Sequence, residues 1–427
     1  MADFNSGEYK RSRTAYMAQS TFEYFVSLLV TDAFLAKLLT SIGISDALTG
    51  IISSFITIAF VIQLASIFLV RLRVSTKALV TTLDTTSIFF FMFLFLVPFL
   101  PVDKTAKTIL VMLSLILAYS SKYLILSVCF KWANAYVEPT KRGSYSATKE
   151  MISLFSGMVF TAAVGYIIDR FEGLNNLNGA FLFIAISILI LNIANFSCLL
   201  MIKRESPFSH RGDFEPLGNV IKNTLRNRNF RHVIVLEVIF KIATYFTAGF
   251  LGVYKTKDLG MTVLLVQIVN IGSNFARMII SKPFGRYSDK HSYVKGFKLG
   301  MILLSFAYLI LMFTTRQTWW LIIVYTAIHS CATAGTNANS FNITYSYVNS
   351  KYITQAMAFK NSIGGLCGFL ASLAGGRLLS VIQANGNMLF GIAVNGQQVL
   401  GAISCVLMIG AVVYTSIVID KQKILIQ

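Results

Sequence analysis

The chain has 427 residues, of which 55% are hydrophobic and only 13% are charged. Its mean hydropathy is +0.67, whereas soluble domains carry roughly a quarter charged residues. A net charge of +19 would indicate nucleic acid in a soluble protein, but the basic residues stand in short links between apolar runs. The composition therefore excludes a soluble domain and a nucleic-acid partner, and it predicts a protein solvated by membrane lipid.

Apolar runs of about 20 residues, enough to cross a bilayer, recur along the chain. The first begins near Thr21, after Lys10, Arg11 and Arg13, and is too long and too interrupted for the apolar part of a cleaved signal peptide. Twelve spans are expected, at 21–39, 45–70, 78–98, 108–130, 150–168, 180–202, 232–254, 261–281, 296–314, 319–340, 357–381 and 397–419.

The longest polar break, 203–231, divides these runs six and six. The sequence therefore predicts an all-α membrane protein of twelve transmembrane helices in two six-helix halves. The halves are expected at 1–202 and 232–427, joined by a cytoplasmic central loop.

The distribution of basic residues predicts the orientation. With the N-terminus inside, and with Lys37, Lys298 and Lys360 at span ends counted with the adjoining segments, the inside segments hold 26 Lys and Arg and the outside loops hold seven. Lys and Arg concentrate on the cytoplasmic side, so both termini are expected there. The remaining four basic residues lie within the spans: Lys122, Lys241, Arg277 and Arg377.

Proline and cysteine usage adds two expectations. All six prolines lie outside span interiors, with Pro283 expected in a loop, so the helices should be continuous. The five cysteines lie in or at the ends of apolar runs and form no CxxC pair. Small buried hydrophobes are expected, with no metal and no disulfide framework.

An internal repeat appears when the chain is shifted by 211 residues. Gly157 then meets Gly368 and Gly165 meets Gly376, so the fifth span falls on the eleventh. A shift of six spans predicts parallel repeats. Both spans are rich in small residues, which let helices approach closely in lipid. The small-residue faces indicate either ordinary helix packing or surfaces that slide past their neighbours as the two halves move.

Twelve spans in two parallel repeats with a basic central loop resemble the major facilitator superfamily over essentially the whole chain. The segment 282–290 resembles that family's loop signature, with Gly285, Asp289 and Lys290 in the matching places. The second glycine and basic pair are missing, and the loop 71–77 of the first half has no Asp. The resemblance implies that Asp289 meets the start of the eleventh helix, near 354–358, as a cytoplasmic gate latch. The alternative is that Asp289 is a charged loop residue that is exposed to solvent and has no role in gating.

The same resemblance implies that spans 1, 4, 7 and 10 line a central cavity. Each has an ionisable residue near its midpoint: Asp32, Lys122, Lys241 and His329. Charged groups inside a membrane are costly and need partners or a water-filled cavity. They indicate either a solute site or buried ion pairs, namely Asp32–Lys122 and Glu237–Lys241.

Polar neighbours at helical spacing extend these positions. Glu237, Lys241 and Tyr245 share one face, as do Tyr325, His329, Thr333 and Asn337. The residues expected to bind solute are Asp32, Tyr119, Lys122, Lys241, Tyr245, Gln267, His329 and Asn337. The residues expected to couple transport to an ion are Asp32, Glu237 and His329.

Two lysines and a histidine facing two carboxylates predict a secondary transporter of an anionic or zwitterionic solute, coupled to protons or sodium. A sugar or oligosaccharide carrier and a drug efflux pump are the transport alternatives, and a membrane sensor, channel or enzyme the others. Since no phosphate-binding Gly-rich loop or metal-ligand spacing occurs, no enzyme activity and no cofactor is expected. The short outward loops have no glycosylation sequon, so we expect a bacterial inner membrane. We also expect a monomer.

Overall fold

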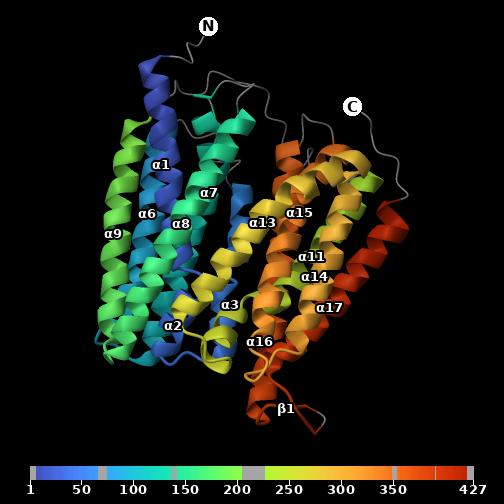
Figure 1. Ribbon diagram of the computed structural model, residues 1–427. Helices are drawn as coiled ribbons and strands as arrows, with labels where there is room; N and C mark the ends of the chain where they lie inside the picture. The colour runs from blue at the N-terminus through green and yellow to red at the C-terminus, as the bar shows by residue number, and fades with distance from the viewer. Residues whose placement is uncertain are drawn as a thin grey trace. The chain divides into compact units, whose positions relative to one another are not determined.

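The computed structural model describes residues 6–65, 75–134, 136–137, 142–203, 227–348, 353–389 and 391–420. Over these residues the protein is helical, apart from one two-stranded hairpin (Figure 1). Most of the expected central loop 203–231, much of the loop 71–77 and the side chain of Asp289 lie outside what is described.

Ten of the described helical segments are long and apolar enough to cross a membrane, and they coincide with ten of the twelve predicted runs. The other two runs, 21–39 and 319–340, also fall on helices. The first helix opens with charged residues, and the other carries His329 among several Asn, Ser and Thr residues. The chain is therefore a multi-pass membrane protein.

The chain forms two compact units. Unit 1 comprises Met1–Ile44, Ile62–Gly212 and Thr262–Gln267, and unit 2 comprises the rest. Each unit thus takes in a short segment from the opposite side of the central loop. The division into two six-helix halves at 1–202 and 232–427 describes the predicted internal repeat, and it stays a prediction.

Unit 1 is built of long helices with 3-10 turns at Gln63–Ala65 and Val97–Phe99. The helices are α1 (Gly7–Leu29), α2 (Asp32–Ser41), α6 (Thr76–Leu96), α7 (Lys104–Asn134), α8 (Arg142–Gly173) and α9 (Leu177–Met201). α6 packs on α7 and α9, and α1 packs on α8 and α9. Leu182, Ile186 and Ile190 of α9 are about half exposed at helical spacing, which suits a lipid-facing surface.

Unit 2 contains the remaining elements, except that the first residues of α13, as far as Gln267, and the last residue of α4 belong to unit 1. They are α3 (Asp46–Ser53), α4 (Ile56–Ile62), α11 (Arg228–Ala248), α12 (Leu251–Val253), α13 (Val263–His291), α14 (Tyr293–Met312), α15 (Leu321–Tyr347), α16 (Ile353–Ala384), β1 (Met388–Leu389), β2 (Ile392–Ala393) and α17 (Gly396–Tyr414). Single π-helical turns follow α12 and α17. α11 packs on α16 and α17, α14 packs on α15 and α17, and α3 packs on α16.

Two of the spans expected to be continuous are broken, although neither contains proline. The run 21–39 breaks between α1 and α2, and the run 45–70 breaks between α3 and α4. At the first break the Thr31 hydroxyl donates to the Ser27 carbonyl (3.1 Å), and at the second the Ser54 hydroxyl donates to the Gly50 carbonyl (3.0 Å). Such side chains compete with the helix ladder and bend it.

The prediction that Pro283 lies in a loop is wrong. Pro283 lies inside α13, which runs without interruption from Val263 to His291. Proline removes one hydrogen bond from a helix ladder. Several turns on either side keep this helix intact, so the signature segment 282–290 extends a span.

Small residues of α16 bring its backbone close to α3 and α4. A Cβ on Gly365 would lie 2.6 Å from the Thr57 carbonyl oxygen. The Ser372 hydroxyl donates to the Ser54 hydroxyl (2.8 Å), and the Ser362 hydroxyl donates to the Phe60 carbonyl (2.7 Å). Close backbone packing and hydroxyl hydrogen bonds are what hold helices together in lipid.

Candidate functional site

Lys122 of α7 is the centre of a charged cluster in unit 1. Its ammonium forms an ion pair with Glu23 of α1, and it lies 3.1 Å from an Asp84 carboxylate oxygen on α6. The Asp84 side chain is 2% exposed. We call Glu23, Asp84 and Lys122 the unit 1 cluster; it has two carboxylates for one ammonium.

Amide groups complete this cluster. The Asn195 amide donates to Asp84 (2.6 Å), and the Gln19 amide donates to Glu23 (2.8 Å) and, more weakly, to Asp84 (3.4 Å). A cavity of about 80 Å³ adjoins the two carboxylates and Lys122. It has room for a few water molecules.

Glu237 of α11 is the centre of a second charged cluster, in unit 2. One of its oxygens lies 3.4 Å from the Lys360 ammonium on α16, and the other lies 3.7 Å from the Lys241 ammonium one turn along α11. The Ser340 hydroxyl of α15 donates to Glu237 (3.0 Å). We call Glu237, Lys241, Lys360 and Ser340 the unit 2 cluster; it has two ammonium groups for one carboxylate.

The two lysines of the unit 2 cluster have different surroundings. Lys360 is 1% exposed and also donates to the carbonyl (2.8 Å) and hydroxyl (2.9 Å) oxygens of Ser340. Lys241 is 19% exposed, and its ammonium lies 5.3 Å from the Phe60 ring centre and 5.7 Å from that of Tyr245. Aromatic faces attract a cation without neutralising it. Lys241 is therefore the more accessible charge of the cluster.

Three other predicted solute-binding residues lie in unit 1, and each has a distinct setting. Asp32 is the first residue of α2, at the break after α1, and has φ +47°. A left-handed non-glycine residue is strained, and such residues gather at functional sites. Tyr119 is 7% exposed and packs edge-on against Phe91. Gln267, near the start of α13, is 5% exposed.

His329 and Asn337 lie on α15 in unit 2 but in different surroundings. The His329 ring is 5.5 Å from the Tyr325 ring and 6.2 Å from the Tyr308 ring, centre to centre. Both tyrosines are almost fully buried, so His329 lies in an aromatic cluster. Asn337 is exposed.

The predicted gating residues lie at the C-terminal end of α13. Gly285 and Lys290 are exposed, and a Cβ on Gly285 would meet no atom within 4 Å. The side chain of Asp289 lies outside the described part of the protein, as do the side chains of 354 and 355. The latch between them stays a prediction.

The structure adds three charged residues that the sequence analysis did not select, namely Glu23, Asp84 and Lys360. Asp84 lies within the predicted span 78–98, and Lys360 lies four residues inside 357–381. The depth argument used for Lys122 and Lys241 extends to Asp84, which lies well inside its span, but not to Lys360, which lies at the end of its span. Gln19 and Glu23 are four residues apart, the spacing of one helix face.

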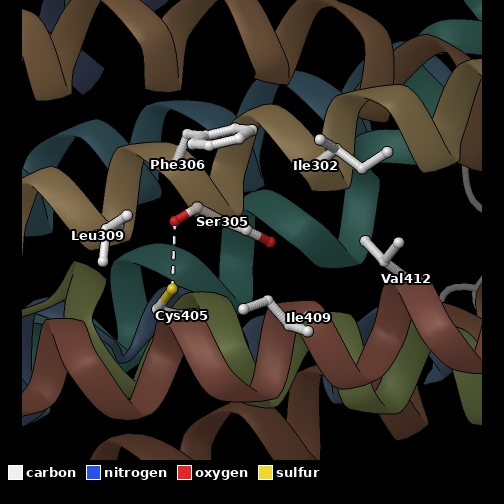
Figure 2. Close-up of a pocket in the computed structure, with 7 residues that line it drawn as sticks. All are labelled: Ile302, Ser305, Phe306, Leu309, Cys405, Ile409 and Val412. Carbon is white, nitrogen blue, oxygen red and sulfur yellow. Dashed lines mark hydrogen bonds between the residues drawn. The ribbon is translucent and has the colours of Figure 1, made fainter.

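A further hollow lies between α14 and α17 (Figure 2), with a volume of about 200 Å³. Its lining is almost entirely aliphatic and aromatic, including Phe306 and Ile409, which are about half exposed. The Cys405 thiol donates to the Ser305 carbonyl oxygen (3.3 Å, Figure 2), and the Ser305 hydroxyl donates to the Met301 carbonyl (2.9 Å). The polar groups of the lining are thus engaged with the backbone, and lipid chains suit this surface.

Comparison with known proteins identifies the fold. The model of a family described as MFS/sugar transport protein matches residues 85–338. A search of curated proteins finds no match. A mutant of the nucleoside transporter NupG superposes with a TM-score of 0.73 at 11% identity, over 95% of this chain and 98% of that one.

Two further solved structures show the same likeness. A bacterial homolog of the human lysosomal transporter Spinster, inward-facing and unoccupied, has a TM-score of 0.69 at 12% identity, over 96% of this chain and 97% of its own. Tetrameric PepTSo2 also has a TM-score of 0.69, at 14% identity, over 96% of this chain and 98% of that one. At these identities the likeness concerns the fold alone.

Proposed function

The chain belongs to the major facilitator superfamily of membrane transporters, as its sequence predicted, and from this premise we propose that it carries a small solute with an anionic group. The proposal includes twelve spans in two six-helix halves, alternating access between the halves, cytoplasmic termini and a bacterial plasma membrane. The structural neighbours are transporters rather than enzymes, in keeping with a carrier.

The charge balance of the unit 2 cluster carries this proposal. Glu237 is the only carboxylate that the described residues place within ion-pair distance of Lys241 and Lys360. A buried charge without a counter-charge is strongly unfavourable. A solute carboxylate or phosphate would supply the missing negative charge.

Within that cluster, Lys241 is proposed as the group that meets the anion. The contacts of Lys360 to Glu237 and Ser340 use its donors, whereas Lys241 has its longer 3.7 Å contact to Glu237 and greater exposure. Tyr245, whose ring neighbours the Lys241 ammonium, would line the same site. A hydrogen bond to a charged group contributes about 1.5–3 kcal/mol. Loss of the Lys241 ammonium should therefore weaken anion binding about 10- to 100-fold.

The remaining sequence-derived roles stay part of this proposal. Asp32, Lys122, Tyr119, Gln267, His329 and Asn337 are candidates for solute contact, and Asp32, Glu237 and His329 for ion coupling. The strained backbone at Asp32 supports a functional role there. Gly285, Asp289 and Lys290 are proposed to form the cytoplasmic gate.

Ligand-dependent thermal unfolding of the purified full-length protein tests the proposal. Glucuronate, glucose 6-phosphate, alanine and glucose are compared on the wild type, Lys241→Gln and Lys282→Gln. Lys282 is exposed on α13, so it matches the charge change away from the cluster. Lys241→Gln leaves Glu237 paired with Lys360, so the variant should still fold.

The expected result is that an anionic compound stabilises the wild type and Lys282→Gln but not Lys241→Gln. A ligand at 100 times its Kd stabilises by about 2.7 kcal/mol. Stabilisation of all three proteins by glucose alone would overturn the anion proposal. That outcome would favour the second candidate, sugar transport, which the description of the matching family supports.

A further inference from the structure

Arg277 is a basic residue inside α13 to which the proposed function gives no role. It lies on the same face of the helix as Phe284 and Ser288, which are both buried. On the opposite face, Phe275 and Ile279 are more than half exposed, as suits contact with lipid. Arg277 itself is half-buried. Its side chain is therefore on the side of α13 that faces the protein and not on the side that faces lipid.

Two contacts show that α13 and α15 run parallel in a fixed register. A Cβ on Gly335 of α15 would lie 2.2 Å from the Phe284 ring of α13. One turn further along both helices, the Asn339 amide of α15 donates to the Ser288 hydroxyl of α13 (3.0 Å). Both contacts join residues that are 51 positions apart in the chain. The same register places Arg277 at the level of residues 328 and 329 of α15.

Arg277 and His329 thus lie at one level of unit 2. The positive charges of Lys255 and Arg277 are both within electrostatic range of the His329 ring. Lys255 is also engaged with another group. The Arg277 guanidinium, by contrast, has no hydrogen bond or ion pair within the described part of the chain. A charged group inside a span needs a partner or a water-filled cavity, and such groups mark solute and ion pathways.

A row of aromatic side chains connects this position to the unit 2 cluster. The Lys241 ammonium lies 5.7 Å from the ring centre of Tyr245 on the same helix. Tyr308 of α14 is within electrostatic range of Tyr245, and its ring centre lies 6.2 Å from that of His329. Lys241 and Arg277 are therefore positive groups at the two ends of one row, and phenol and imidazole groups between them can donate hydrogen bonds.

We propose that Arg277 binds a second anionic group of the transported solute, which is then a dianion with two separated carboxylate or phosphate groups. This rests on the proposed function, in which Lys241 binds the first group. A guanidinium donates two parallel N–H bonds to a carboxylate or phosphate, and the His329 ring can add a further donor. The unit 2 cluster has one positive charge in excess among the described residues, and Arg277 adds another. A dianion balances both.

Isothermal titration calorimetry of the purified full-length protein tests this inference. Butyrate, succinate, glutarate, adipate and phosphoglycolate are titrated at constant ionic strength in chloride. At least one dianion should bind the wild type about tenfold or more tightly than butyrate, because it makes a second charge-assisted contact. The length of the dicarboxylate that binds best reports the spacing of the two positions. Phosphoglycolate distinguishes a phosphate group from a second carboxylate.

Two variants of Arg277 localise the second position, and a third variant is the control. Arg277→Gln should bind the best dianion only as tightly as butyrate, while its affinity for butyrate stays that of the wild type. Arg277→Lys keeps the charge but loses the two parallel donors, so its affinity should be intermediate. Arg286→Gln makes the same charge change at an exposed position of α13 and should bind every compound as the wild type does.

Dianions that bind the wild type no more tightly than butyrate would overturn the inference. So would an Arg277→Gln variant that binds the best dianion as the wild type does. If Lys241→Gln still weakens butyrate binding in either case, the proposed function stands without this inference. If Arg277→Gln weakens dianion binding but Lys241→Gln weakens no compound, Arg277 is confirmed as an anion site and the proposed role of Lys241 is rejected.

Discussion

The unit 1 and unit 2 clusters are built from the same side chains in opposite proportion. In unit 1, Lys122 faces the two carboxylates of Glu23 and Asp84. In unit 2, Glu237 faces the two ammonium groups of Lys241 and Lys360. In each cluster two groups of one sign share a central group of the other sign, and Lys149 adjoins the cavity of the unit 1 cluster. The difference shows that the same kind of buried ion pair can be built around either sign of charge, depending on which helices supply the two outer groups.

The largest effect on stability is expected from loss of Lys122, the central charge of the unit 1 cluster, whereas Lys241 is an outer charge of the unit 2 cluster. Lys122→Met leaves Glu23 and Asp84 without their ammonium, and loss of one partner from a buried pair costs about 3–5 kcal/mol. Lys241→Met should cost much less, because Glu237 keeps Lys360 and Ser340. Thermal unfolding in detergent measures both. Equal losses for the two lysines would break the comparison between the clusters.

The second largest effect on stability is expected from close helix packing, which differs between the two units. Gly365→Ala in unit 2 forces a methyl group to 2.6 Å from the Thr57 carbonyl oxygen, and overpacking typically costs about 1–3 kcal/mol. Gly157→Ala in unit 1 meets the Tyr24 ring, a side chain that can move, so a smaller loss is expected. Their unfolding temperatures provide the measurement.

Gly272→Ala is the control for these glycine variants. A Cβ there meets no atom within 4 Å, and alanine favours a helix interior over glycine by about 0.5–1 kcal/mol. A slight rise in unfolding temperature is expected. If Gly365→Ala also raised the unfolding temperature, the close packing of α16 would not be what makes this glycine necessary.

The smallest effect is expected from a surface ion pair. The Lys203 ammonium lies 2.5 Å from the Glu8 carboxylate, and it holds the pKa of Glu8 below its ordinary value of 4.5. A lowered folded-state pKa stabilises the fold above that ordinary value, and the gain is lost as the pH falls through the lowered pKa.

The change in unfolding temperature from above to below pH 4.5 should therefore be slightly smaller in Glu8→Gln than in the wild type. Exposed pairs contribute little, so this difference should be well below the effect of Lys122→Met. If the difference for Glu8→Gln were as large as the effect of Lys122→Met, burial would not determine how much each ion pair contributes to stability.

Local properties of the sequence determined much of the fold. Apolar runs of about 20 residues predict spans because lipid cannot satisfy an open backbone, and ten described helices agree with ten such runs. The transporter family followed from the run pattern and the signature around Gly285 and Asp289, and the family match confirms it. The depths of Lys122 and Lys241 likewise follow from their places within apolar runs.

Only the tertiary structure decided which charges meet. Asp32 was a predicted partner for Lys122, but the structure gives Lys122 an ion pair with Glu23 and a contact with Asp84. The predicted pair of Glu237 and Lys241 is confirmed, whereas Lys360 was not predicted as a partner of Glu237. Glu237 and Lys241 are one turn apart on a single helix, so periodicity is enough to find that pair. Contacts between α1, α6 and α7, or between α11 and α16, depend on how each helix is rotated against its neighbours, and packing sets that rotation.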